Sequence, residues 1–97
     1  MGKFVYIYTG GSRPESEEEG QKVMKQWMDW LGGMGEHVTD VGNPFGESAS
    51  VNGGATLNAS GYTIVEAGSL GEATTHAKGC PIFDRGGNVE VYEALEM

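Results

Sequence analysis

The chain is poor in cysteine and in positive charge. Its 97 residues include one cysteine, Cys80, so no internal disulfide can form, as is typical of proteins in reducing compartments. Six Lys and Arg residues stand against 14 Asp and Glu, and the formal net charge is −8 at pH 7. The basic residues are scattered, whereas phosphate backbones and anionic membranes are bound by clustered Lys and Arg. Nucleic-acid and membrane partners are therefore not expected.

Long apolar runs are also missing. No run approaches the roughly 20 residues that span a bilayer. The N-terminus leads directly into Phe4–Tyr8, which is too short and too aromatic for the apolar core of a signal peptide. We therefore predict a cytoplasmic protein, and the length predicts a single domain over residues 1–97.

Glycine is abundant, with 17 residues, and several glycine pairs separate patterned segments. Residues 3–9 are the first patterned segment, and every position from Phe4 to Tyr8 is aromatic or β-branched, which predicts a strand covered on both faces. A capping box of Ser16 and Glu19 then opens a helix of about five turns, ended by glycines at 32, 33 and 35. We expect one side of this helix to face the core with Val23, Met24, Trp27, Met28, Trp30, Leu31 and Met34.

The second half of the chain repeats this alternation. Residues 37–41 form a short mixed strand, and residues 62–67 form a second buried strand. Residues 47–60 between them are either a surface loop or, around Asn52-Gly53, a small hairpin. A capping box of Ser69 and Glu72 opens a second helix that ends at Gly79, and residues 88–95 alternate as a half-exposed strand. The expected apolar stripe of this helix is Leu70, Ala73 and Ala77.

The order β-α-β-β-α-β predicts an α+β, ferredoxin-like fold. In that arrangement the first and third strands are central in a four-stranded antiparallel sheet, with two helices on one face. The uncovered face of the first strand would expose an apolar patch of about several hundred Å². We therefore predict a homodimer that pairs sheet to sheet about a two-fold axis and forms a dimeric α+β barrel.

An ordered set of short motifs resembles the YCII-related family of small dimeric α+β barrel proteins. The resemblance covers nearly the whole chain and rests on the aromatic first strand, the helix ending in glycine, Gly42-Asn43-Pro44-Phe45, residues 62–67, Ser69-Leu70-Gly71-Glu72-Ala73, Cys80-Pro81 and Val89-Glu90-Val91. It implies a ferredoxin-like fold, a dimer with a cavity between sheet and loops, and an enzymatic activity without a settled reaction. The family's histidine in the first helix has no counterpart, because Lys25 and Gln26 stand there. Its acidic residue after the Gly-Pro-Phe turn is replaced by Gly46 followed by Glu47.

Candidate catalytic residues are His37, Asp40 and Glu66. A histidine and a carboxylate can act as base and orienting group. Three residues apart in a regular strand, however, His37 and Asp40 point to opposite faces. Polar residues at an exposed sheet edge are the alternative interpretation.

Candidate ligand-binding residues are Tyr6, Tyr8 and Tyr62 on the central strands. One alternating set would face the cavity, where a hydroxyl could orient a small molecule. Core tyrosines with satisfied hydroxyls are the alternative. Residues 47–60 would then be a lid over the cavity or merely tolerated length.

The remaining reactive residues have structural interpretations. His76 lies off the apolar stripe of its helix and is expected in solvent. Cys80 follows a helix C-terminus, which does not favour a thiolate, so a packing role is expected. No three residues have metal-ligand spacing, and we expect no metal and no cofactor.

Three function classes stay open. The chain is a small-molecule enzyme that transfers protons with Asp40 or Glu66 and His37, a non-catalytic small-molecule-binding or regulatory module, or a purely structural dimerisation domain.

Overall fold

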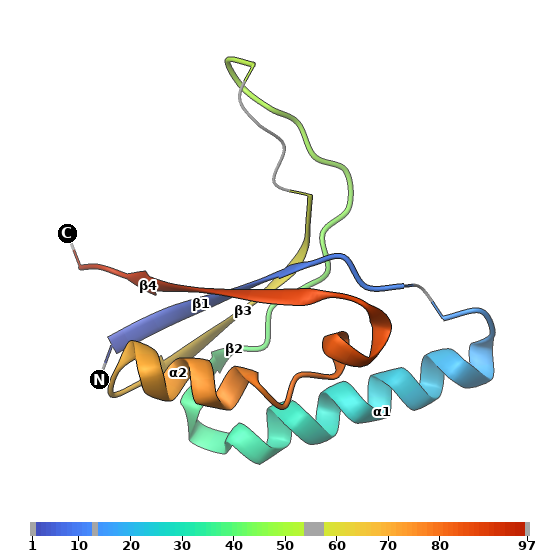
Figure 1. Cartoon of the computed structure of the whole chain (residues 1–97), viewed down its shortest axis with the longest axis horizontal. Helices are drawn as coiled ribbons and strands as arrows, with labels where there is room; N and C mark the ends of the chain where they lie inside the picture. Colours follow the sequence, from blue (N-terminus) through green and yellow to red (C-terminus); the bar gives the residue numbers. More distant parts are fainter. Residues whose placement is uncertain (1, 13, 54–57, 97) are drawn as a thin grey trace.

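The structure is a computed structural model that describes residues 2–12, 14–53 and 58–96. The elements follow the predicted order, with two short 3-10 helices added (Figure 1). They are β1 (Gly2–Thr9), α1 (Glu17–Met34), η1 (Gly35–His37), β2 (Val38–Asp40), β3 (Ala59–Ala67), α2 (Leu70–Ala77), η2 (Pro81–Arg85) and β4 (Asn88–Ala94). No helix within these ranges is both long and apolar enough to cross a membrane.

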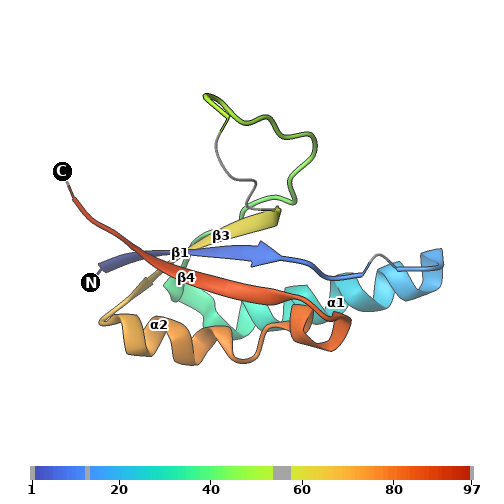
Figure 2. The same ribbon diagram turned by 45° about the horizontal axis from the view of Figure 1, so that its top comes forward.

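The four strands form one antiparallel sheet in the order β2-β3-β1-β4. The two strands expected in the centre, β1 and β3, are central, which confirms the ferredoxin-like fold. Both helices lie on the same face of the sheet, and residues 45–53, after β2, stand away on the other side (Figures 1 and 2). The sheet therefore has one covered face and one open face.

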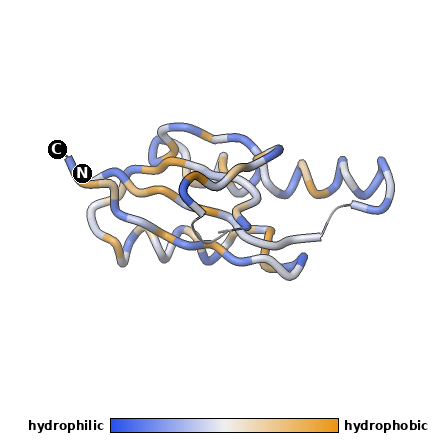
Figure 3. The backbone as a smooth tube through the Cα atoms, turned by 90° about the horizontal axis from the view of Figure 1, so that it is seen from above, coloured by the Kyte–Doolittle hydropathy of each residue, from blue (hydrophilic) through white to orange (hydrophobic). Residues whose placement is uncertain are grey.

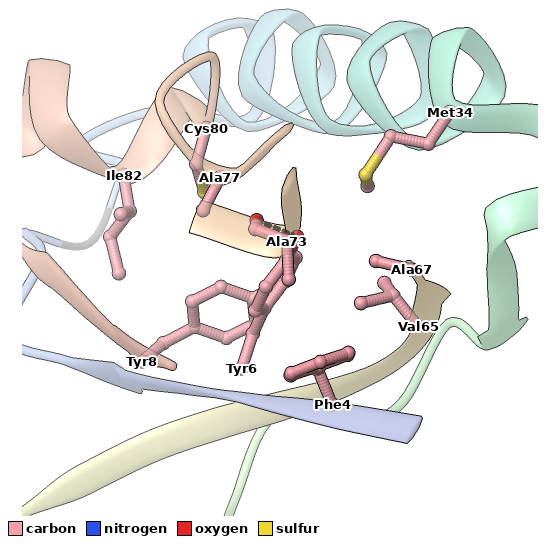
Figure 4. Packing of buried hydrophobic residues seen from close by; sticks show 10 residues of the cluster. All are labelled: Phe4, Tyr6, Tyr8, Met34, Val65, Ala67, Ala73, Ala77, Cys80 and Ile82. Carbon is pink, nitrogen blue, oxygen red and sulfur yellow. Dashed lines mark hydrogen bonds between the residues drawn. The ribbon is translucent and has the colours of Figure 1, made fainter. Parts of the chain in front are cut away.

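The core lies between the sheet and the two helices (Figure 4). Phe4, Tyr6 and Tyr8 project from β1 into it, and the register places Phe4 beside Val65 and Tyr6 beside Thr63 of β3. Within the single chain only one face of β1 is covered, as expected for two helices on one side of the sheet. The alternate residues of β1 are only half-buried on the open face, because both helices pack on the other side.

Helix α1 begins as predicted, since the Ser16 side chain accepts a hydrogen bond from the Glu19 backbone N–H. It continues through the glycine pair at 32–33 and ends at Gly35, whose φ is +56°. The predicted apolar stripe is too wide. Met24 and Met28 are 68% and 66% exposed, because the helix turns only a narrower row towards the core: Trp27, Trp30, Leu31 and Met34.

Helix α2 packs closely on the sheet through Ala73 and Ala77, which are both buried. Its position is held by two hydrogen bonds to backbone carbonyls. The Tyr6 hydroxyl donates to the Ala73 carbonyl, and the Trp30 indole N–H donates to the His76 carbonyl at 3.1 Å. Leu70, expected in the stripe, is 51% exposed.

The segment after β2 returns alongside the start of β3. The Phe45 N–H donates to the Ser60 carbonyl oxygen at 2.8 Å, and Pro44 forms an isolated antiparallel β-bridge with Gly61. Between the two alternatives for residues 47–60, the described part shows a turn at Asn52-Gly53 with no strand directly before it. Gly54 and Ala55, which the hairpin would include, lie outside the described residues.

Candidate ligand-binding cleft

A cleft of about 480 Å³ opens between α1 and the sheet. Its walls come from the first half of α1, from the end of β1, from the start of β3 and from residues 41–44. The first half of α1 extends beyond the strands (Figure 1), so its apolar side chains are free to line a cleft rather than to fill the core.

One wall of the cleft is aromatic and apolar. Tyr8 and Trp27 meet edge to face, with ring centroids 5.0 Å apart and planes at 86°. Val23 and Met24 extend this wall along α1, and Ile82 adds to it from η2. The exposure of Met24, unexplained by a core role, follows from its place in this lining.

The floor of the cleft holds a short chain of hydrogen bonds. The Tyr8 hydroxyl donates to Thr63 Oγ1 at 2.7 Å, and Thr63 Oγ1 donates to the Val41 carbonyl at 2.9 Å. The Tyr8 oxygen keeps acceptor capacity for a ligand donor. Burial raises the pKa of Tyr8 above its ordinary value, although the Thr63 hydrogen bond opposes the rise. Tyr8 is therefore a neutral phenol at physiological pH.

The lining is uncharged. None of the described residues around the cleft is Asp, Glu, Lys, Arg or His. Polar side chains come from Asn43 and Ser60 besides the tyrosines and Thr63. An uncharged, mostly apolar cleft selects uncharged ligands, because burying an unpaired charge there is costly.

Asp40 reaches the rim of the cleft through Tyr62. Its Oδ1 accepts a hydrogen bond from the Gly42 N–H at 2.9 Å, and its Oδ2 lies 3.5 Å from the Tyr62 hydroxyl. The Phe45 ring stacks on Tyr62 with a centroid distance of 5.6 Å. Tyr62 borders the cleft, but the register places its side chain beside Ile7 on the open face of the sheet, so the Asp40–Tyr62 pair lies on the opposite side of the sheet from Tyr8 and Thr63.

The other predicted catalytic residues lie elsewhere. His37 belongs to η1 rather than to the predicted strand, and its Nδ1 hydrogen-bonds the Glu66 carbonyl at 3.1 Å. Its ring packs against His76, on the side of the helices. The Glu66 side chain is exposed, and Glu66 pairs with Lys3 in the sheet register. The structure does not bring His37, Asp40 and Glu66 to one place.

The three predicted tyrosines are also divided. Tyr8 and Tyr62 line the cleft. Tyr6 is fully buried outside the lining, with its hydroxyl on the Ala73 carbonyl, and burial raises its pKa to about 12. Thr63, missed at the sequence level, has one usable signal: it is a hydroxyl residue on the buried alternating set of β3.

Cys80 lies in the core at 3% exposure, just before η2. Burial raises the pKa of its thiol to about 11, so the thiol stays protonated near neutral pH. Its surroundings agree with a packing role.

Away from the cleft, the structure brings together His37, Glu72 and His76 as potential metal ligands. This differs from the expectation, drawn from sequence spacing, that no three residues could do so. The spacing argument failed because His37 is distant in sequence from the other two. His76 is half-buried against His37, not in solvent as expected.

No family model matches the chain, and no curated protein matches it. A solved structure does. It is 5-chloro-2-hydroxyhydroquinone dehydrochlorinase (TftG) from Burkholderia phenoliruptrix, in complex with 2,5-dihydroxybenzoquinone. The TM-score is 0.61 at 18% sequence identity, over 98% of this chain and 95% of that chain. The likeness is one of fold. It agrees with the general fold family that the sequence motifs resemble.

Proposed function

We propose that this protein binds a small, neutral, mostly apolar ring compound, of the size and polarity of a simple phenol, in the cleft between α1 and β3. The observation that carries the proposal is the uncharged cleft itself, with an aromatic wall on one side and a hydroxyl pair at its floor. Its volume of about 480 Å³ falls within the roughly 300–1,000 Å³ of small-molecule sites.

The lining matches such a ligand group by group. The rings of Tyr8 and Trp27 offer faces and edges for aromatic stacking. The Tyr8 oxygen can accept a hydrogen bond from a ligand hydroxyl, and the side chains of Asn43 and Ser60 add further polar contacts. The structural neighbour with this fold was solved with a compact ring compound, 2,5-dihydroxybenzoquinone, which supports a single small ring as the ligand.

Calorimetric titration with hydroquinone tests the proposal. Tyr8→Phe keeps the ring and removes the hydroxyl, so we expect affinity to fall about 3- to 10-fold for one lost hydrogen bond. Tyr6→Phe is the matched control, because Tyr6 is an equally buried, hydrogen-bonded tyrosine outside the lining. The proposal would be contradicted if the wild type gave no heat of binding, or if both variants lost affinity equally.

An acid–base enzyme is the second candidate, favoured by the Asp40–Tyr62 pair at the rim. The carboxylate would hold or accept the Tyr62 proton while a phenol binds at the open-face side of the rim, where the Tyr62 hydroxyl lies. Such a pair should accelerate exchange of the ring protons of resorcinol with D₂O, followed by proton NMR. Asp40→Asn should abolish the acceleration and Glu66→Gln should keep it, because Glu66 is absent from the lining. If the wild type does not accelerate the exchange, the enzyme candidate is contradicted and only the binding function remains.

We further propose that the chain works as a homodimer through the open face of the sheet. Figure 3, seen from above, shows apolar stretches along the strands. The register gathers Val5, Ile7, Ile64 and Tyr92 there: Val5 lies between Ile64 and Tyr92, and Tyr92 is 56% exposed. A second copy offers the same apolar surface, and a two-fold axis lets the two surfaces cover each other.

A further inference from the structure

Two histidines and a glutamate converge at the end of the sheet where β3 leads into α2. One ligand atom from each of His37, Glu72 and His76 lies within 4.8 Å of the others. Glu72 and His76 are four residues apart on α2 and so share one helix face. The Glu72 Oε1 to His76 Nε2 distance is 3.7 Å, and the two imidazole centroids are 4.8 Å apart.

His37 is oriented by the backbone. Its Nδ1 lies 3.1 Å from the Glu66 carbonyl oxygen, and a carbonyl can only accept, so Nδ1 carries the proton. The neutral ring then keeps the lone pair of Nε2 free. Metal-binding histidines are held in this way, with the second ring nitrogen donating to a carbonyl or carboxylate.

His76 has a buried nitrogen in need of a partner. Its Nε2 is inaccessible to solvent and has no hydrogen-bond partner among residues 2–12, 14–53 and 58–96. The Glu72 carboxylate, at 3.7 Å, is too far for a hydrogen bond. The backbone of α2 is held in place here by the hydrogen bond that the Trp30 indole N–H donates to the His76 carbonyl oxygen. A buried, unpaired ring nitrogen is costly, and a bound cation would satisfy it.

We propose that His37, Glu72 and His76 form a binding site for a divalent transition-metal ion, with Zn²⁺ the best match. Two imidazoles and one carboxylate are ligands that suit zinc and leave a fourth position open, whereas Ca²⁺ and Mg²⁺ prefer oxygen alone. The net charge of −8 favours cations in general.

The spacing needs only a small contraction. In a tetrahedral zinc site with bonds of about 2.0–2.1 Å, neighbouring ligand atoms lie about 3.3–3.4 Å apart. The separations of 3.7 Å and at most 4.8 Å exceed this by amounts that side-chain rotation can close. Neither helix has to move.

This site is separate from the cleft and does not depend on the function proposed for it. The cleft touches β3 at residues 60–63, and His37 hydrogen-bonds β3 at Glu66. The three residue steps of strand from Thr63 to Glu66 span about 10 Å. A metal ion here would join η1 to α2, the two segments that flank the end of β3.

The test is titration of tag-free protein with ZnCl₂ by calorimetry and with CoCl₂ by visible absorption. We expect one ion per chain and the d–d bands of a low-symmetry Co²⁺ complex. His37→Ala, Glu72→Gln and His76→Asn should each weaken binding at least about tenfold. Glu90→Gln, an exposed carboxylate on β4, is the control and should bind as the wild type does.

A second measurement separates loss of the site from loss of the fold. Saturating ZnCl₂ should raise the melting temperature of the wild type and of Glu90→Gln, because the ion binds the folded state. His76→Asn, folded by circular dichroism, should show no rise. The proposal would be overturned if the wild type did not bind Zn²⁺ stoichiometrically. It would also be overturned if the variants at the three proposed metal-binding residues bound Zn²⁺ and gained thermal stability as the wild type does.

Discussion

The indole N–H of Trp30 donates to the carbonyl oxygen of His76 at 3.1 Å, which joins the two helices. The relationship also connects the two sites of the molecule. The Trp30 ring meets Trp27, a wall of the cleft, with centroids 5.6 Å apart, and His76 belongs to the proposed metal site. The packing between α1 and α2 therefore supports both.

Trp30→Phe should destabilise the fold. The substitution removes the donor and leaves a partly buried carbonyl unpaired, which costs about 1–3 kcal/mol of unfolding free energy. Urea denaturation measures the change. Trp27→Phe is the control, because it trims an indole of the same cluster and keeps the Trp30–His76 hydrogen bond. Equal losses in the two variants would show that ring size, and not the hydrogen bond, matters.

Thr63→Val should damage the floor of the cleft. Thr63 is 1% exposed and is hydrogen-bonded to both the Tyr8 hydroxyl and the Val41 carbonyl. Valine fills the same space without these bonds, so we expect a loss of about 1–3 kcal/mol in unfolding free energy. Thr74→Val, at an exposed site where the hydroxyl bonds within its own helix, should cost less. A neutral Thr63→Val would contradict the hydrogen-bond chain.

Gly42→Ala should displace the segment that follows β2. Gly42 has a φ of +77°, and an added Cβ would lie 1.6 Å from the Tyr62 carbonyl oxygen. The backbone must therefore move, which would open the cleft rim and weaken hydroquinone binding along with stability. Gly46→Ala is the matched control, since nothing lies within 4 Å of its added Cβ. Similar melting temperatures and affinities for the two variants would show that the close approach is absent.

Glu19 should contribute to stability in a pH-dependent way. The Arg85 guanidinium, 2.8 Å away, is the main cause that lowers the pKa of this carboxyl in the folded protein. A lowered folded pKa gives stability that is present above the unfolded value, about 4.3, and is lost as pH falls through the folded value. Glu19→Gln should therefore lower the unfolding free energy at pH 7. It should also reduce the loss of unfolding free energy that the wild type shows as the pH falls into the acid range, as measured by urea denaturation at several pH values. Glu17→Gln, which removes a carboxylate of the same helix turn outside the Arg85 ion pair, is the matched control, and equal effects of the two variants would contradict a role for that pair.

Ile7→Lys should produce monomers. Ile7 lies on the open face between Tyr62 and Glu90, where the proposed dimer would bury it. A lysine there would have to lose its hydration, so association should fail. Native mass spectrometry of the wild type, of Ile7→Lys and of Gln26→Lys measures this, the last being a charge added on exposed α1. A wild-type monomer, or dimers in all three, would refute the sheet-to-sheet pairing.

Local patterns in the sequence determined most of the elements. The caps at Ser16 and Ser69 depend on hydrogen bonds to residues three positions away, so they can be predicted from a short stretch of chain. The alternation of strands and helices then leaves few topologies, and the sheet order follows from it. The ferredoxin-like fold was predictable for this reason.

Only the tertiary structure decided what the side chains do together. The partners Tyr8 and Thr63 are 55 positions apart in the chain, and Trp30 and His76 are 46 apart. Periodicity states which face of an element is apolar, but not which distant residue it meets. Periodicity therefore predicts a core position for Met24, which lines the cleft. Proximity in sequence makes Asp40 a candidate partner of His37, but the His37 ring lies against His76. Register, helix placement and the return of the chain after β2 set these contacts, and they exist only once the sheet has formed.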